Sequence, residues 1–159
     1  MVFQVGDRVV YPMHGAGVIE AIEEHEVLGE RQQYYVMKLP IGDMKIMIPT
    51  QGVQEIGLRE VMSESECNRV FQILRSSGEE LSDNWNRRYR ANVEKLKTGD
   101  IYEVAEVVRN LSCREKDKGL STGEKKMLDN ARQILISELI LAKDIQEEQA
   151  NLLIDEALA

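Results

Sequence analysis

The spacing of apolar residues changes once along this chain, near Gly57, and that change limits what the chain can fold into. Before Gly57, apolar side chains alternate with polar ones over short runs, which is typical of half-buried β-strands. After Gly57, they recur every three or four residues, which is typical of amphipathic helices. The chain has 159 residues, enough for one ordinary domain or two small ones. We therefore predict an α+β fold with the strands first.

The segment before Gly57 predicts a small barrel. Strand-like runs lie at 8–11, 18–27, 33–39 and 44–48, and Gly15-Ala16-Gly17 has the composition of a tight turn. Short strands at such spacing, too few for a sandwich, favour an SH3-like or Tudor-like five-stranded β-barrel. We assign this domain to residues 1–60.

Two of these strands carry apolar side chains on both faces. Alternation places Met44 and Ile48 on the inner face of the last strand and Met47 on its outer face. In the preceding strand, Tyr34 and Val36 share the outer face. Two interpretations stay open: the carboxy-terminal half covers this outer surface, or the surface binds a partner protein, with a free strand edge available for pairing.

The segment after Gly57 predicts five helices with short connections. A helix begins near residues 82–84, and the other starts are marked by Ser63 with Glu66, Asp100 with Glu103, Ser121 with Glu124, and Asp144 with Glu147. Five such helices make a compact bundle, which we assign to residues 61–159. No linker rich in Pro, Gly or Ser separates the two parts, and Val61 and Met62 are placed to pack them together.

The stretch Asn84–Arg90 holds the single tryptophan of the chain and three arginines. In a helix, Trp85 and Tyr89 lie one turn apart on one stripe, and we expect Arg87, Arg88 and Arg90 to spread over the neighbouring surface. A flat apolar wedge beside cations suits a partner with phosphates and stacked bases. The alternative is that Trp85 is a core residue with solvated arginines around it, and the stretch alone leaves both open.

The charge distribution favours a local contact with a polyanion. The net charge is −8, which argues against a protein that coats nucleic acid. Basic residues nevertheless outnumber acidic ones between Ser82 and Arg132, so the rest of the chain is strongly acidic. Lys97, at the end of the Trp85 helix, and the pair Lys125 and Lys126, at the start of the long helix, add cations to this segment.

No catalytic or metal-binding pattern accompanies these features. The chain lacks GxSxG, a P-loop and a GxGxxG after a strand, and neither His14 nor His25 has ligand-spaced partners. Cys67 and Cys113 are isolated and are expected to be reduced. No apolar run reaches about 20 residues, and the amino terminus does not resemble a signal peptide. We expect a cytoplasmic protein without enzymatic activity, cofactor, metal or membrane contact.

Five segments together resemble the bacterial CarD/CdnL family of transcription regulators, in order and with the family's spacing: Phe3–Asp7, Val10–Gly17, Ile46–Pro49, Trp85–Arg90 and Leu120–Leu128. The barrel half also resembles the polymerase-interacting domain of the transcription-repair coupling factor. The resemblance implies that the barrel docks through a strand edge on the β1 lobe of the RNA polymerase β subunit. It also implies that the helical domain reaches promoter DNA at the upstream edge of the bubble.

The resemblance assigns residues to both contacts. On the polymerase side it implies Val36, Met47 and Pro49, to which alternation adds Tyr34. Some relatives carry arginines where this chain has His25 and Met47, so an apolar contact is expected here. On the DNA side it implies a tryptophan wedge that opposes bubble collapse, with cations on the phosphates: Trp85, Arg87, Arg88, Arg90, Lys125 and Lys126. The contact is expected to be largely independent of DNA sequence.

The competing interpretation is a protein-only adaptor whose helical domain binds a second protein and whose Trp85 belongs to the core. The two differ in the exposure of Trp85, because a wedge requires an accessible indole and a core residue does not. In either case we expect a monomer, and under the family interpretation a protein located on the nucleoid through RNA polymerase.

Overall fold

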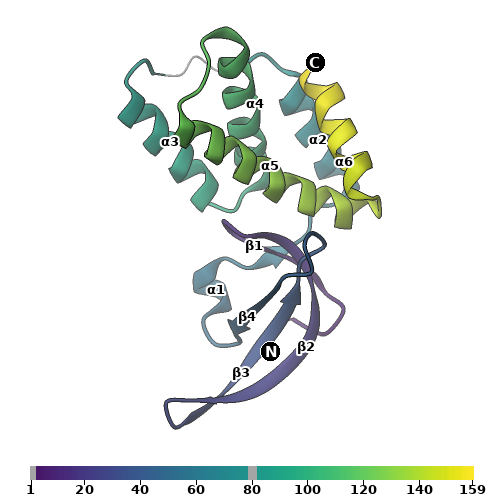
Figure 1. Cartoon of the computed structure of the whole chain (residues 1–159). Helices are drawn as coiled ribbons and strands as arrows, with labels where there is room; N and C mark the ends of the chain where they lie inside the picture. The colour runs from purple at the N-terminus through teal and green to yellow at the C-terminus, as the bar shows by residue number, and fades with distance from the viewer. Residues whose placement is uncertain (1–2, 79–81) are drawn as a thin grey trace.

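A computed structural model describes residues 3–78 and 82–159. An antiparallel sheet forms the amino-terminal part and a helical bundle the carboxy-terminal part, so the predicted α+β fold is confirmed (Figure 1). The strands are β1 Arg8–Tyr11, β2 Gly15–Val27, β3 Glu30–Lys38, β4 Lys45–Pro49 and β5 Arg59–Glu60, with a short helix α1 Val53–Ile56 before β5. The remaining helices described are α2 Glu64–Arg75, α3 Trp85–Lys97, α4 Ile101–Asp117, α5 Thr122–Lys143 and α6 Glu147–Leu158.

The five strands pair in the order β4-β3-β2-β1-β5, so β4 and β5 are the edges of the sheet. The inner face holds one core cluster, whose buried members are Phe3, Val9, Ile19, Tyr35, Met37, Ile48, Val53 and Leu58. The alternation of β3 and β4 therefore predicted correctly which side chains turn inward. It was wrong for Met44, which precedes β4 and is exposed.

The predicted turn at Gly15–Gly17 is also wrong. Gly15, Ala16 and Gly17 lie within β2, where they pair with β1. The chain reverses immediately before these residues, at Pro12–His14, and Met13 lies in the left-handed region at φ 71°. Glycines are required inside the strand because Gly17 lies against Met37 and the carbonyl of Lys38, at distances that leave no room for a side chain.

Two of the predicted capping boxes are confirmed. Ser63 caps α2 together with Glu66, and Ser121 caps α5 together with Glu124. Asp100 caps α4 by accepting a hydrogen bond from the amide of Tyr102. Asp144 does not open α6 as predicted, because it ends α5 in a left-handed conformation at φ 52°, which Asp tolerates better than most residues.

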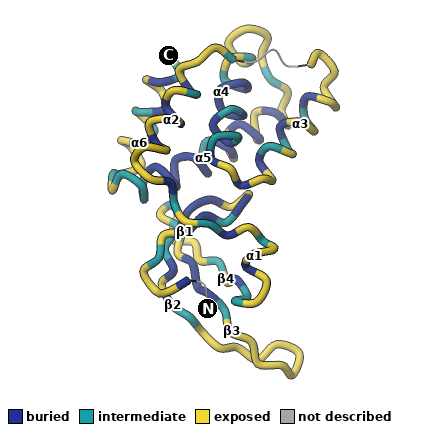
Figure 2. The backbone as a smooth tube through the Cα atoms, turned by 180° about the vertical axis from the view of Figure 1, so that it is seen from behind, coloured by how far each residue is buried: buried dark blue, intermediate teal, exposed yellow. Residues whose placement is uncertain are grey.

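Helix α5 is the central element of the bundle and also its connection to the sheet. It packs against α2, α4, α6 and β2, and most of its middle is buried (Figures 1 and 2). The buried residues of α5 belong to the helical core cluster, which Met62 joins from the connection after β5. The sequence placed Met62 between the two parts of the chain. The structure buries its side chain in the helical core.

A buried carboxylate on α5 holds the connection between the two parts. Glu138 is fully buried, and Arg59 of β5 donates to it through both terminal nitrogens at 2.8 and 2.9 Å. The amide of Met62 donates to the same carboxylate at 2.7 Å. Arg59 also donates through Nε to the carbonyl of Gly99, at 2.8 Å. One acid thus joins the sheet edge, the connecting segment and the long helix.

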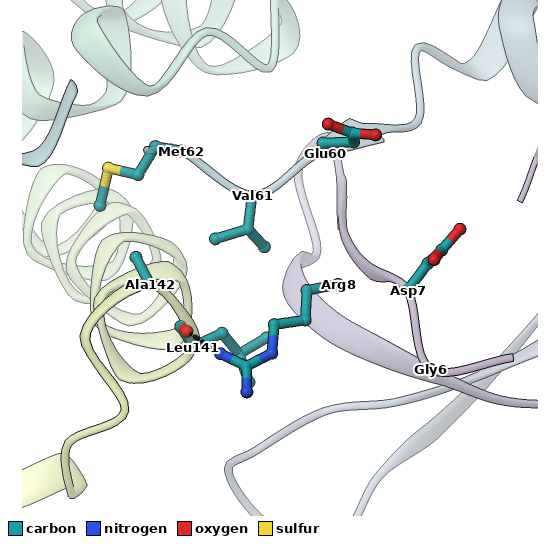
Figure 3. A pocket seen from close by; sticks show the side chains of 8 residues that line it. All are labelled: Gly6, Asp7, Arg8, Glu60, Val61, Met62, Leu141 and Ala142. Atoms are coloured by element: carbon teal, nitrogen blue, oxygen red, sulfur yellow. Dashed lines mark hydrogen bonds between the residues drawn. The ribbon is translucent and has the colours of Figure 1, made fainter. Parts of the chain in front are cut away.

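A second contact joins α5 to β2. The amide of Ala16 donates to Ser137 Oγ at 2.9 Å, and this hydroxyl donates in turn to the carbonyl of Ile134. A side chain at Gly15 would lie 2.7 Å from the Ser137 hydroxyl, so only glycine fits there. At the rim of the junction, Arg8 pairs with Asp144 at 2.9 Å, beside a pocket lined by Val61 and the end of α5 (Figure 3).

We predict that Glu138→Gln lowers the free energy of unfolding by about 2 kcal/mol or more, because Arg59 loses its charged partner in a largely buried setting. Urea denaturation of the purified chain measures this. Glu94→Gln is the matched control, since Glu94 is exposed and its ion pair with Lys97 is long, at 3.7 Å; it should change stability by less than about 0.5 kcal/mol. Equal effects of the two variants would contradict the role of Glu138.

Candidate functional site

Trp85 is the first residue of α3, and it is neither in the core nor free. Its side chain is 42% exposed and is absent from both core clusters of the described residues. Its ring stacks on Tyr89, with centroids 4.8 Å apart and an interplanar angle of 17°. The predicted one-turn stripe is therefore confirmed. The adaptor interpretation, which required Trp85 to be core, loses its main premise.

The first turn of α5 fixes the orientation of the indole. Trp85 Nε1 donates to Ser121 Oγ at 2.9 Å. The same hydroxyl caps α5 by accepting from the amide of Glu124, and it lies 3.1 Å from Glu124 Oε1. Both aromatic rings also lie over Gly123, where a Cβ would be 3.6 Å from Trp85 and 3.8 Å from Tyr89. The tryptophan is thus fixed by α5 and by Tyr89, and 42% of its side chain stays exposed.

A buried ion pair lies behind this contact. Arg88 Nε donates to Glu124 Oε2 at 2.7 Å, and Arg88 Nη2 donates to Glu124 Oε1 at 3.0 Å. The two residues are 5% and 1% exposed. The prediction that Arg88 lies on the surface is therefore wrong. Arg88 shares the inward stripe of α3 with Asn92 and Leu96, four residues apart, and is bound to Glu124 instead of being exposed.

The pair shifts the titration of both partners. Hydrogen bonding from Arg88 lowers the pKa of Glu124, and the Ser121 hydroxyl contributes in the same direction. Hydrogen bonding to Glu124 raises the pKa of Arg88. Both groups are therefore charged at neutral pH, and the bidentate geometry suits a guanidinium facing a carboxylate.

Four of the predicted cations are exposed on the two helices that meet at the tryptophan. Arg87 and Arg90 lie on α3, and Lys125 and Lys126 lie in the first turn of α5, next to the glycine under the rings. Two helix amino termini, those of α3 and α5, meet here, and helix amino termini favour anions. The structure thus brings together five of the seven predicted DNA-facing residues in exposed positions.

Lys97 lies apart from this group. It is at the opposite end of α3 from Trp85, about 18 Å along the helix axis, and it pairs with Glu94. The structure therefore does not bring Lys97 to the tryptophan.

The four predicted polymerase-facing residues lie together on the outer face of β3 and β4. Tyr34 pairs with Pro49, and Val36 pairs with Met47. Met47 is 47% exposed, whereas Tyr34 and Pro49 are half-buried. Val36 is only 6% exposed, contrary to expectation. It is flanked on the same face by Ala21 and Met47, which belong to the strands on either side.

The outer edge of β4 is free of strand pairing within the described part of the chain. The same residues contain no cluster of three or more His, Cys, Asp or Glu side chains that would hold a metal ion. None of their helices has the length and apolar character needed to cross a membrane. Two features remain as candidate binding sites. One is the free edge of β4 with the exposed Met47, and the other is Trp85, which is bonded to Ser121 on helices that carry exposed cations.

Two family models match this chain in succession. The CarD-like/TRCF RID domain matches residues 3–62, and the CarD C-terminal domain matches residues 69–155. The chain belongs to the CarD family. Membership places it among transcription regulators and not in a known family of enzymes, and the match to the RID domain implies an interaction with RNA polymerase.

One relative agrees with this assignment over almost its full length. YdeB of Bacillus subtilis (strain 168), a candidate transcription factor, is 48% identical over 147 residues, which cover 92% of this chain and 96% of YdeB. The solved structure of CdnLNt from Myxococcus xanthus is 45% identical and covers 40% of this chain and 90% of its own, with a TM-score of 0.35.

Sequence reasoning missed two residues of the site. Ser121 and Glu124 were identified as a capping box, but their contacts with Trp85 and Arg88 were not foreseen. A signal was present, since Arg88 falls on the same stripe as Leu96, and an inward arginine needs an acidic partner. Nothing in the local pattern shows that the partner lies 36 positions away.

We predict that Glu124→Gln lowers stability by about 3 kcal/mol at neutral pH, because Arg88 keeps its charge in a buried position. The folded-state pKa of Glu124 is lowered, so its contribution is complete above the ordinary carboxyl pKa and is lost as pH falls through the lowered value. The difference in the free energy of unfolding between wild type and variant should therefore become smaller in acid. Urea denaturation as a function of pH measures this difference, and a difference independent of pH would contradict the ion pair.

Proposed function

We propose that this chain binds the β subunit of bacterial RNA polymerase, at the β1 lobe, and stabilises the promoter open complex by inserting Trp85 at the upstream edge of the bubble. One observation carries the proposal: a half-exposed tryptophan is fixed by Ser121 at the junction of two helices, and these helices carry four exposed cations. A rigid aromatic face beside cations is suited to wedging against a base step while the phosphates are neutralised.

The charge of the chain limits how it uses this surface. Four cations contribute a salt dependence of binding whose logarithmic slope is about −4 at most. The acidic remainder repels DNA, so affinity for free duplex is weak. The chain therefore needs a second anchor to remain at a promoter.

The sheet supplies that anchor. The free edge of β4 can accept a strand from a partner, and Met47 offers an exposed apolar side chain beside it. Attachment to polymerase raises the effective concentration of Trp85 at the bubble, into the mM range for a short connection. The contact with DNA is then largely independent of sequence, and the chain acts as a monomer on the nucleoid.

The two anchors are joined by α5. Its amino terminus holds the indole through Ser121, and its second half is bonded to the sheet through Ser137 and Glu138. A wedge on a rigid connection opposes bubble collapse without an added ordering cost. A stabilisation of about 1.4 kcal/mol shifts the open-complex equilibrium tenfold.

We predict that Trp85→Ala shortens the lifetime of the open complex about tenfold and leaves binding to the β subunit unchanged. Ser121→Ala should give a smaller decrease, because the indole remains but loses its fixed orientation. Open-complex decay after a competitor challenge measures both. A wild-type lifetime for Trp85→Ala would disprove the wedge, and equal losses for the two variants would show that Ser121 acts on folding instead.

The polymerase contact has its own test. Met47→Glu places a charge in the apolar contact, so binding to the purified β subunit should weaken at least tenfold while thermal stability is retained. Leu152→Glu is the matched control, because Leu152 is an exposed apolar residue on α6, in the other half of the chain. Undiminished binding of Met47→Glu would place the polymerase contact elsewhere.

A further inference from the structure

The methionines of this chain divide into two classes by burial. Within residues 3–78 and 82–159, the buried ones are members of the core clusters: Met37, Met62 and Met127. The exposed ones are absent from both clusters of the described residues: Met13, Met44 and Met47, at 37%, 59% and 47% exposure. Oxidation turns a methionine from an apolar side chain into a polar sulfoxide, and the oxidant has to reach the sulfur first. An oxidant in solution therefore modifies the surface of this chain and leaves its cores intact.

Two of the exposed methionines lie at the junction of the sheet and α5. Met13 and Met44 line one cavity of about 270 Å³, together with Gln133 and Ile134 of α5. A sulfoxide at either position adds a polar group to this junction and not to the outer face of the sheet. These two residues therefore serve as internal controls for an effect at the third.

Met47 lies on the outer face, beside the free edge of β4. Its neighbours Ile46 and Ile48 pack in the core cluster of the sheet, so alternation turns Met47 outward. There it is paired across the strands with Val36, which is buried. A sulfoxide oxygen at Met47 is a hydrogen-bond acceptor, and burying it against an apolar partner surface without a donor is unfavourable. A single added oxygen atom thus changes the polarity of the face on which the polymerase contact was proposed.

The two cysteines do not protect Met47 from an oxidant. Cys67 is buried, and this burial raises the pKa of its thiol, so little of the reactive thiolate is present at neutral pH. Cys113 is exposed, but it lies on α4 in the helical part of the chain. Its oxidation leaves the outer face of the sheet unchanged.

We propose that Met47 is a reversible oxidation site that controls binding of this chain to RNA polymerase. This inference rests on the proposed function, because it takes its partner from there. It goes further in naming a modification, the residue that carries it and its effect on the complex.

The oxidant is a hydroperoxide, and the step is a two-electron transfer of one oxygen atom. The thioether sulfur attacks the terminal peroxide oxygen, so that an S–O bond forms as the O–O bond breaks. The proton on the transferred oxygen passes to the leaving oxygen, which departs as water or an alcohol. Sulfur is oxidised and the peroxide is reduced. A sulfoxide reductase reverses the change with two thiols, which become a disulfide as water is released.

The test measures binding to the purified β subunit before and after treatment of the chain with hydrogen peroxide, which is removed before mixing. A Cys113→Ser background eliminates the exposed thiol. Peptide mass spectrometry should find added oxygen at Met47 and little at the buried Met37. Affinity should fall about tenfold, and the two classes of methionine sulfoxide reductase, one for each epimer, should restore it. The melting temperature should stay within a few degrees, because neither core is modified.

Two variants assign the effect to one sulfur. Met47→Leu has no thioether at this position, so its affinity, whatever its starting value, should be equal before and after peroxide. The double variant Met13→Leu/Met44→Leu is the matched control, because it keeps Met47 and should lose and regain affinity as wild type does. If Met47→Leu binds too weakly to measure, loss and recovery in this double variant decide the assignment.

The outcomes separate this inference from the proposed function. Binding of the untreated chain together with unchanged affinity after peroxide would overturn the oxidation site alone. Peroxide sensitivity that persists in Met47→Leu, or disappears in Met13→Leu/Met44→Leu, would also overturn it, because another group would then be responsible. An untreated wild-type chain that does not bind the β subunit would overturn both.

Discussion

The buried carboxylate of Glu138 is the interaction on which the arrangement of the molecule depends. It accepts hydrogen bonds from Arg59 and from the amide of Met62, so the edge of the sheet, the connecting segment and α5 meet at one charged group. A carboxylate without partners in this position would destabilise the fold by several kcal/mol. The sheet and the bundle are therefore joined by a charged hydrogen-bond network.

A similar arrangement recurs at the other end of the same helix. Glu124 is buried on α5 and paired with Arg88 of α3, about 21 Å along the axis from Glu138. Each acid lies on α5 and each arginine on another element. The two pairs fix the two ends of the helix, one to the sheet and the other to the element that carries Trp85. The separation between the sheet and the surface that carries Trp85 is thus set by the length of α5.

The sequence predicted those features that local signals encode. Alternation identified the inner face of β3 and β4, and capping boxes located the starts of α2 and α5. The spacing of Trp85 and Tyr89 placed them on one stripe, where their rings stack. Burial that depends on distant partners was missed. Arg88 is buried because of Glu124, 36 positions later, and Val36 is covered by neighbours on two other strands. The family assignment supplied a partner for the sheet, which no local pattern could name.

The hydrogen bond from Trp85 to Ser121 has a consequence for regulation. An indole has a single donor, and here that donor is already engaged within the protein. The ring can therefore present to DNA only its face and its hydrocarbon edge, which do not distinguish one base pair from another by hydrogen bonding. Under the proposed function, the regulator carries no promoter code of its own. How strongly a gene responds then depends on how readily its own promoter closes.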